Sequence, residues 1–400
     1  MTTKRTLPRA SITRTGALFA AACLISSVME ASAADWSAST RFSQSVEAND
    51  NRPLTSPPAR ETYEFASQLM LSTIARMPGW RIQADADVSY RTLAGPGADE
   101  STSPIDNGVR LRAEKIEKLT KYYVGGAWRR QDATSAQIAD SGIVIANGDI
   151  NTYILEAGLS RTVSPLDTVT WSIQGRSVDF SSSTASSYID TTSTGVWTRH
   201  LDPLTDVFVL AQTEWLARDD AAQTDTLFAR AMVGLDARLT KQLNFKGSVG
   251  TGFQMTDQEH PLTLPGPIAT SHSTGWLADV QFTYRPLLNT ELTFYGTRSI
   301  SPSVIGEIEQ RATVGVGLRQ GINHSSYLSL STELGRQTSL DGLTYDNADV
   351  FRASVLYGYK LSPEWQAQVA YRYLHRSDDT GSAHSNAVFL SAVREVTILP

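Results

Sequence analysis

The sequence contains a single cysteine, Cys23, and that residue lies in a segment that we expect to be removed from the mature protein. The remaining chain then has no thiol that could form a disulfide, ligate a metal ion or act as a nucleophile. Clustered positive charge is also missing, and the formal net charge of the whole chain is −6. Since nucleic-acid binding depends on basic clusters, we expect no nucleic-acid partner.

Long apolar runs are absent from the chain after Ala33. No later segment has the roughly 18 consecutive apolar residues that a membrane helix requires. A chain without such a helix can still cross a membrane as a closed β-barrel, because closure leaves no unpaired backbone edge in lipid.

The first residues have the order of a secretory signal peptide. Basic residues from Lys4 to Arg14 precede an apolar run, and Ala31-Ser32-Ala33 supplies the small residues of a cleavage site. We expect cleavage after Ala33, which divides the chain into a leader, 1–33, and a mature domain, 34–400. The alternative is that Cys23 is a lipoprotein acceptor. It is disfavoured because the apolar run continues past Cys23 and the cleavage site lies downstream.

A period of two governs the stretch from Trp80 to Arg91. Its even-numbered residues, such as Trp80 and Ile82, are apolar or aromatic, and its odd-numbered residues, such as Arg81 and Asp85, are polar. A helix would mix the two kinds, whereas a strand separates them onto two faces. The same pattern recurs at 244–254, 276–284 and 365–373, and less regularly at 108–118 and 187–199.

Short and long connections alternate between these strands. The short ones contain the Pro, Asp, Asn and Ser residues of tight turns, as in Met77-Pro78-Gly79 and Ser362-Pro363-Glu364. The long ones are rich in Ser, Thr, Asp and Gly, as in 94–107, 132–149 and 256–273. In an up-and-down barrel, short turns fall on the periplasmic rim and long loops fall outside.

We therefore predict an all-β fold: a transmembrane, up-and-down antiparallel β-barrel of about 18 strands, with 16 also possible. It has short periplasmic turns and long extracellular loops, and it lies in the outer membrane of a Gram-negative cell, in contact with lipid and lipopolysaccharide. A secreted β-sandwich also alternates along its strands. It would not explain why short and long connections take turns, or why tryptophans gather near strand ends.

The cost of charge in lipid fixes which face points outward. An arginine facing lipid at mid-membrane costs on the order of 2 to 4 kcal/mol, so Ile82 to Val88 should meet lipid through their apolar members. The charged members should face the lumen. Alternate residues of each strand therefore face lipid and lumen, and we call this assignment the parity of the strand. Applied along the chain, it places the following basic residues in the lumen: Arg81, Arg91, Arg110, Arg112, Arg129, Arg176, Arg230, Arg238, Lys246, Arg311, Arg319, Arg352 and Arg372.

Fewer acidic residues are expected on the same face. They are Asp85, Asp87, Glu114, Glu156, Glu214, Asp236, Asp279 and Glu333. The interior therefore reads as basic, with the surplus acids in loops and turns. Two interpretations stay open: the guanidinium groups line a path for an acidic solute or polymer, or they form ion pairs that stiffen the barrel.

Enzymatic chemistry has little support, and we expect neither catalysis nor a cofactor or metal. His375 with Asp378 and Asp379, or His260 with His272, supply residue types for a hydrolase at the rim. No nucleophile motif or metal-ligand spacing accompanies them.

Two motifs resemble a known family, the outer-membrane β-barrel porins of the second type that are found with exopolysaccharide or capsule gene clusters. The first motif is Phe42 to Asn51, a strand running into Glu47-Ala48-Asn49-Asp50-Asn51, and the second is the hairpin Leu361-Ser362-Pro363-Glu364-Trp365. Read physically, Asn49-Asp50-Asn51 is an Asx-rich turn, with chelation of a divalent cation as an alternative.

The resemblance implies export of an acidic exopolysaccharide or capsular polysaccharide through the lumen, with polysaccharide and periplasmic export or synthesis proteins as partners. A general or anion-selective diffusion porin is the main alternative. A surface barrel whose loops bind a partner, or whose rim hydrolyses a substrate, is a further one.

Overall fold

The computed structural model describes residues 34–56, 58, 60–98, 104–140, 148–181, 185–220, 224–258, 269–302, 308–339, 347–379 and 381–399. The expected leader with Cys23 and the cleavage site after Ala33 lies outside these residues, as does His260. Among the described residues, no helix is long and apolar enough to cross a membrane.

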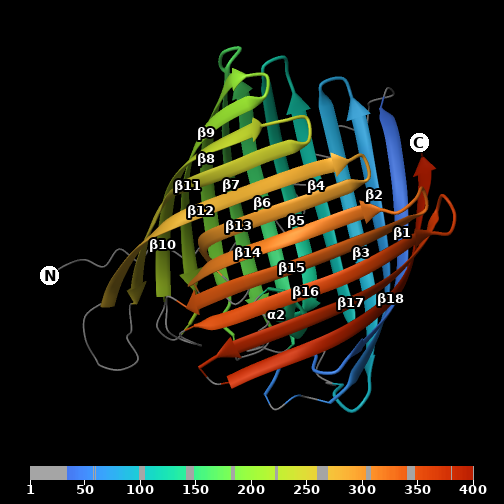
Figure 1. Cartoon of the computed structure of the whole chain (residues 1–400). Helices are drawn as coiled ribbons and strands as arrows, with labels where there is room; N and C mark the ends of the chain where they lie inside the picture. Colours follow the sequence, from blue (N-terminus) through green and yellow to red (C-terminus); the bar gives the residue numbers. More distant parts are fainter. Residues whose placement is uncertain are drawn as a thin grey trace.

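Eighteen strands form one closed antiparallel sheet, which confirms the predicted barrel and its strand number (Figure 1). Each strand pairs with its neighbours in sequence, and β18 pairs with β1 to close the circle. The first nine strands are β1 (Asp35–Asn49), β2 (Thr62–Met77), β3 (Trp80–Ala94), β4 (Ile105–Ile116), β5 (Thr120–Asp132), β6 (Asp149–Thr162), β7 (Asp167–Phe180), β8 (Tyr188–Asp202) and β9 (Thr205–Arg218). The second nine are β10 (Thr224–Arg238), β11 (Leu243–Gln258), β12 (Ala269–Leu287), β13 (Thr290–Pro302), β14 (Ile308–Gly321), β15 (Ser326–Ser339), β16 (Ala348–Lys360), β17 (Trp365–Asp378) and β18 (Gly381–Leu399).

Eight short turns, from the one between β2 and β3 to the one between β16 and β17, join strands at one rim, which we call the periplasmic rim. The turn between β2 and β3 is a two-residue hairpin, and Gly79 there has a φ of 75°, a left-handed conformation that glycine adopts without strain. The longer connections join the strands at the opposite rim, which we call the outer rim. The connection between β17 and β18, from Asp378 to Gly381, is also at this rim but is short. The strands are longer than a bilayer crossing requires, so part of each extends beyond the apolar belt.

The outward face is apolar, and its aromatic residues gather near both rims. Trp80, Trp197 and Trp365 lie near the periplasmic rim, and Trp215 and Trp276 lie towards the outer rim. All five side chains are exposed on the barrel's outside, with Trp276 at 57%. Such girdles mark the two lipid interfaces of a membrane barrel.

One helix, α2 (Ala133–Asp140), follows β5 and lies inside the barrel near the outer rim (Figure 1). Asp132 caps it, since the Ser135 backbone N–H donates to Asp132 Oδ2 at 2.7 Å. Ala133 is fully buried in an apolar cluster that includes Ile150, Val178 and Leu216 on the inner wall. The helix is thus held against the wall of the barrel by apolar contacts.

The loop between β1 and β2, here called L1 (residues 50–61), also turns inward. Leu54 is 3% exposed and packs against Val350, Leu374 and Ala383 of β16, β17 and β18. Leu54 has a φ of 52°, a left-handed conformation that costs a branched residue on the order of 1 kcal/mol. Its burial offsets that cost.

Candidate functional site in the barrel lumen

The strand register places all the predicted lumen cations on the inner face of the wall. For example, Asp85 of β3 is the register partner of Arg110 of β4. Arg112 of β4 is the partner of Gly125 of β5, and Gly125 is in turn the partner of Glu156 of β6. The outward partners in the same rows are apolar, such as Ala86 with Val109. The position of each cation is therefore fixed by its parity along the strand, whereas a role in solute passage stays a prediction.

Most of these cations form ion pairs with inner-face carboxylates. Arg110 and Arg112 both reach Glu156 at 3.1 Å, and Arg112 lies 4.0 Å from the centre of the Tyr123 ring. The other pairs are Arg91 with Asp106, Arg129 with Asp87 (3.5 Å), Arg176 with Asp190 (2.5 Å), Arg311 with Glu309 (2.8 Å), Arg352 with Glu333 (2.9 Å) and Arg372 with Glu47 (3.2 Å). Arg230 instead donates to the Gln212 amide oxygen at 2.6 and 3.1 Å.

Four cations of the predicted set lack such a partner. Among the described residues, no carboxylate lies within 4.0 Å of Arg81, Arg238, Lys246 or Arg319, and Arg319 lies 5.0 Å from the centre of the Tyr327 ring. Each of the four is near the periplasmic end of its strand. The cations of the predicted set without an ion pair therefore lie in the periplasmic part of the lumen, although the register sets Glu114 beside Arg81, Asp236 beside Lys246 and Glu291 beside Arg319.

The expectation of a basic interior does not hold. Further carboxylates share the inner face, and sequence reasoning had left them out or assigned them to loops: Glu47, Glu64, Asp106, Asp190, Asp206, Glu291, Glu309, Asp378 and Glu395. With them, 17 carboxylates share the inner face with the 13 predicted cations, and further bases, such as Arg41, Arg76, Arg285 and Arg376, also face inward. Neither sign of charge dominates the lumen. The physical reason is that a guanidinium group on a confined wall is stabilised by a carboxylate partner, so the two kinds accumulate together.

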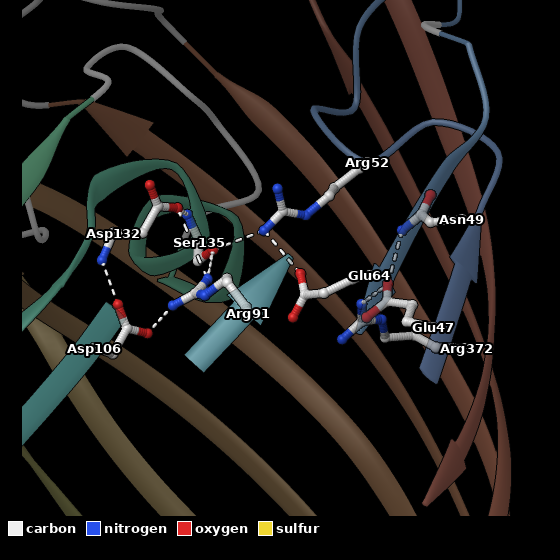
Figure 2. A network of polar contacts seen from close by, with 9 residues as sticks. All are labelled: Glu47, Asn49, Arg52, Glu64, Arg91, Asp106, Asp132, Ser135 and Arg372. Carbon is white, nitrogen blue, oxygen red and sulfur yellow. Dashed lines mark hydrogen bonds and ion pairs between the residues drawn. The ribbon is translucent and has the colours of Figure 1, made fainter. Parts of the chain in front are cut away.

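A compact polar group joins L1 and α2 at the outer end of the lumen; we call it the mouth cluster (Figure 2). Its members are Arg52, Glu64, Arg91, Asp106, Asp132 and Ser135. The Ser135 hydroxyl accepts hydrogen bonds from Arg52, at 2.8 Å, and from Arg91. Arg52 also pairs with Glu64 at 3.0 Å. One hydroxyl on the inward helix therefore ties together L1 and the wall strand β3.

The mouth cluster is well buried. The side chains of Arg91 and Arg52 are 8% and 12% exposed, and that of Asp132 is 0% exposed. Buried guanidinium groups keep their charge, so each needs the carboxylates around it. Sequence reasoning missed this cluster. The available signals were Asp132 followed by Ser135, an N-capping pattern, and Leu54 as an isolated apolar residue in a polar loop.

The motif Asn49-Asp50-Asn51 joins the first strand to the last. Asp50 accepts hydrogen bonds from the Asn386 backbone N–H at 2.7 Å and from Asn386 Nδ2 at 2.6 Å. Asn49 Oδ1 accepts from the Ser385 hydroxyl at 2.8 Å, and Asn51 Nδ2 donates to the His384 carbonyl at 2.9 Å. The Asx-rich turn is present. The side-chain oxygens of Asn49 and Asp50 accept from β18, and that of Asn51 accepts from Thr55.

Two of the histidines considered for a rim hydrolase, His272 and His375, lie in the described part of the chain, and neither is paired there with an acid. His375 has outward parity on β17, whereas Asp378 lies on the inner side and pairs with Arg376. His272 lies on the outward side, stacked on Phe253 with ring centres 5.9 Å apart. Within the described part of the chain, no three His, Cys, Asp or Glu residues are grouped closely enough to hold a metal ion.

No protein-family model matches the sequence, and no curated protein matches it. Solved structures do resemble the fold. Acinetobacter baumannii OccAB2 matches with a TM-score of 0.52 and 8% identity, over 91% of this chain and 98% of that one. Pseudomonas aeruginosa OccK8 (OprE) and a BenF-like porin from Pseudomonas fluorescens each match with a TM-score of 0.51 and 9% identity, over 91% of this chain and 99% of theirs.

Likeness at these identities concerns the fold, which is that of a porin-type barrel. Together with the closed 18-stranded sheet and its apolar belt, it confirms the expected location in the Gram-negative outer membrane, in contact with lipid and lipopolysaccharide. The narrower resemblance to exopolysaccharide-associated barrels stays a prediction.

Proposed function

We propose that this barrel is a diffusion channel for small hydrophilic solutes and that L1 and α2, joined by the mouth cluster, narrow its outer mouth. The observation that carries the proposal is the exposure of inward-facing ion pairs. The inner-face side chains of Arg110, Arg129 and Arg372 are 55%, 52% and 45% exposed, although each pairs with a carboxylate. A packed plug would bury them, whereas a water-filled lumen leaves them half hydrated.

The mouth cluster lies where a solute would enter from outside. L1 packs on β16 to β18, α2 packs on the wall around β6 to β9, and the Arg52 to Ser135 hydrogen bond joins them. Because these side chains are buried and paired with one another, the cluster acts by holding L1 and α2 in place. A solute instead meets the exposed ion pairs of the wall, such as Arg110 with Glu156. Such a balanced set favours polar solutes over apolar ones and gives only weak preference for either sign of charge.

Single-channel recording in planar bilayers tests the proposal. The purified protein should give stepwise conductance with weak ion selectivity, and Arg52→Ala should change the conductance or its fluctuations because L1 and α2 lose their link. As a matched control, Arg285→Ala removes an inner-face arginine that pairs with Glu291 at the periplasmic end, far from the mouth. A protein that folds and inserts but never conducts would overturn the proposal.

A second candidate is export of an acidic exopolysaccharide or capsular polysaccharide, assisted by periplasmic proteins. It is favoured by one observation, the unpaired Arg81, Arg238, Lys246 and Arg319 near the periplasmic rim, where a polymer leaving the cell would enter. Block of the conductance by acidic oligosaccharide added from the periplasmic side, lost when these four residues become neutral, would support export. Equal block from both sides would favour the diffusion channel.

A further inference from the structure

The outward face near the outer rim carries two arginines in one row of the register. Arg298 of β13 pairs with Ala312 of β14, and Ala312 pairs with Arg336 of β15. The two arginines are thus two strands apart, about 10 Å between backbones, with only a methyl group between them. Their parity is that of Phe294, Val314 and Leu334, which are all exposed on the lipid side.

Arg298 forms no ion pair with any carboxylate of the described residues. Its guanidinium lies 4.4 Å from the centre of the Trp276 ring, and its Nε is buried without a hydrogen-bond acceptor. Trp276 belongs to the outer aromatic girdle, so this cation lies at the level of the lipid headgroups. A cation facing lipid without a carboxylate is costly, unless the membrane itself supplies an anion.

Arg336 forms a fork with Asp349, Nε to Oδ1 at 2.7 Å and Nη2 to Oδ2 at 2.9 Å. Both side chains are well exposed, at 66% and 56%. The fork uses two of the five N–H donors of the guanidinium group, so three are left for another acceptor. Taken together, Arg298, Ala312, Arg336 and Asp349 carry one net positive charge. Arg298 lies against Trp276 of β12 and Arg336 against Asp349 of β16, each on the side of its strand away from Ala312.

We propose that Arg298 and Arg336 bind a phosphate group of a lipopolysaccharide molecule in the outer leaflet. Each arginine is long enough to turn from its present neighbour over Ala312, where both guanidinium groups would meet one tetrahedral anion, and arginine matches phosphate oxygens with paired donors. The two arginines lie at the level of the membrane interface, which the Trp276 ring marks, so a lipid phosphate is favoured over a free one. The site lies on the barrel's outside and is independent of solute passage.

Lipopolysaccharide binding to the purified protein in detergent tests this inference. The probes are intact lipopolysaccharide, the same lipid after removal of its phosphates, and inorganic phosphate. Intact lipid should raise the temperature at which the barrel unfolds, and the double variant R298Q/R336Q should weaken its binding by roughly tenfold or more per arginine. The charge-conserving variant R298K/R336K should recover part of the affinity.

A matched control lies on the opposite rim. Arg394 also has outward parity, lies 5.6 Å from the Trp365 ring centre and pairs with Glu364, but it faces the inner leaflet. R394Q should leave lipopolysaccharide binding unchanged. Equal binding of intact and dephosphorylated lipid, equal binding of inorganic phosphate, or full affinity in a folded R298Q/R336Q variant would each overturn the inference.

Discussion

Asp50 and Asn386 join the two ends of the chain, 336 residues apart in sequence, through two hydrogen bonds of 2.6 and 2.7 Å. They lie beside the outer end of the β1 and β18 pairing. Among the described strands, this is the one pairing whose two members do not follow each other in the chain. Closing this seam costs more chain entropy than forming a hairpin, because the loop that it closes is the whole barrel. The side-chain hydrogen bonds between Asp50 and Asn386 therefore stabilise the pairing of β1 with β18, which no short connection brings together.

Replacing Asp50 tests the seam. Asp50→Ala removes the acceptor of both bonds and should lower the stability of the folded barrel by about 2 to 3 kcal/mol, because bonds to a charged acceptor are stronger than neutral ones. Asp50→Asn should lie between this variant and the wild type. The measurement is the temperature at which the barrel loses its compact mobility in a denaturing gel. Asp379→Ala, an exposed carboxylate near β18, serves as the control, and an equal loss there would contradict the assignment.

The parity of β3 can be tested with two neighbouring substitutions. Ala86→Arg places a charge on the lipid face near mid-strand and should cost on the order of 2 to 4 kcal/mol, whereas Ser89→Arg adds the same charge to the lumen and should cost much less. Folding yield into lipid vesicles, followed as a function of urea, measures both. If Ser89→Arg proved the more damaging of the two, the assigned faces would be reversed.

The fold could be predicted because its signals are local. A two-residue period, as from Trp80 to Arg91, identifies a strand without knowledge of its partners, and the alternation of short and long connections identifies their order. The alternation of apolar and polar residues is least regular in β4 and β8. In β8 the run Asp190-Thr191-Thr192-Ser193-Thr194 is polar on both faces, so its alternation is weak although the strand is well formed.

The lumen could be predicted only in part, because its contacts are not local. Parity placed each arginine, but it could not tell that Arg372 would meet Glu47 from the far end of the chain. Neither could it tell that Leu54 would fold inward onto Val350, or that Ala133 would begin a helix packed on Ile150. These contacts depend on closure of the barrel, which brings distant strands together at the outer rim.

Arg91 provides a test of the mouth cluster. Its removal leaves Asp106 and the fully buried Asp132 without their shared cation, and breaking a buried ion pair in this way costs on the order of 3 to 5 kcal/mol. Arg91→Ala should therefore destabilise the barrel far more than Arg110→Ala, whose side chain is 55% exposed. Unfolding of the two variants in urea compares them directly. Equal losses would mean that the mouth cluster is hydrated like the rest of the lumen.

A substitution at Leu54 tests whether the position of L1 matters for solute passage while Arg52 is kept. Leu54→Asp puts an unpaired carboxylate into the apolar site formed by Val350, Leu374 and Ala383, so L1 should leave the wall while Arg52 itself is retained. If L1 narrows the path at the outer mouth, the single-channel conductance should rise, and residues 50–61 should become open to added protease. Leu204→Asp is the control, since that leucine is 50% exposed in a periplasmic turn and touches neither segment. A Leu54→Asp protein with new protease cleavage but unchanged conductance would mean that L1 does not limit solute passage.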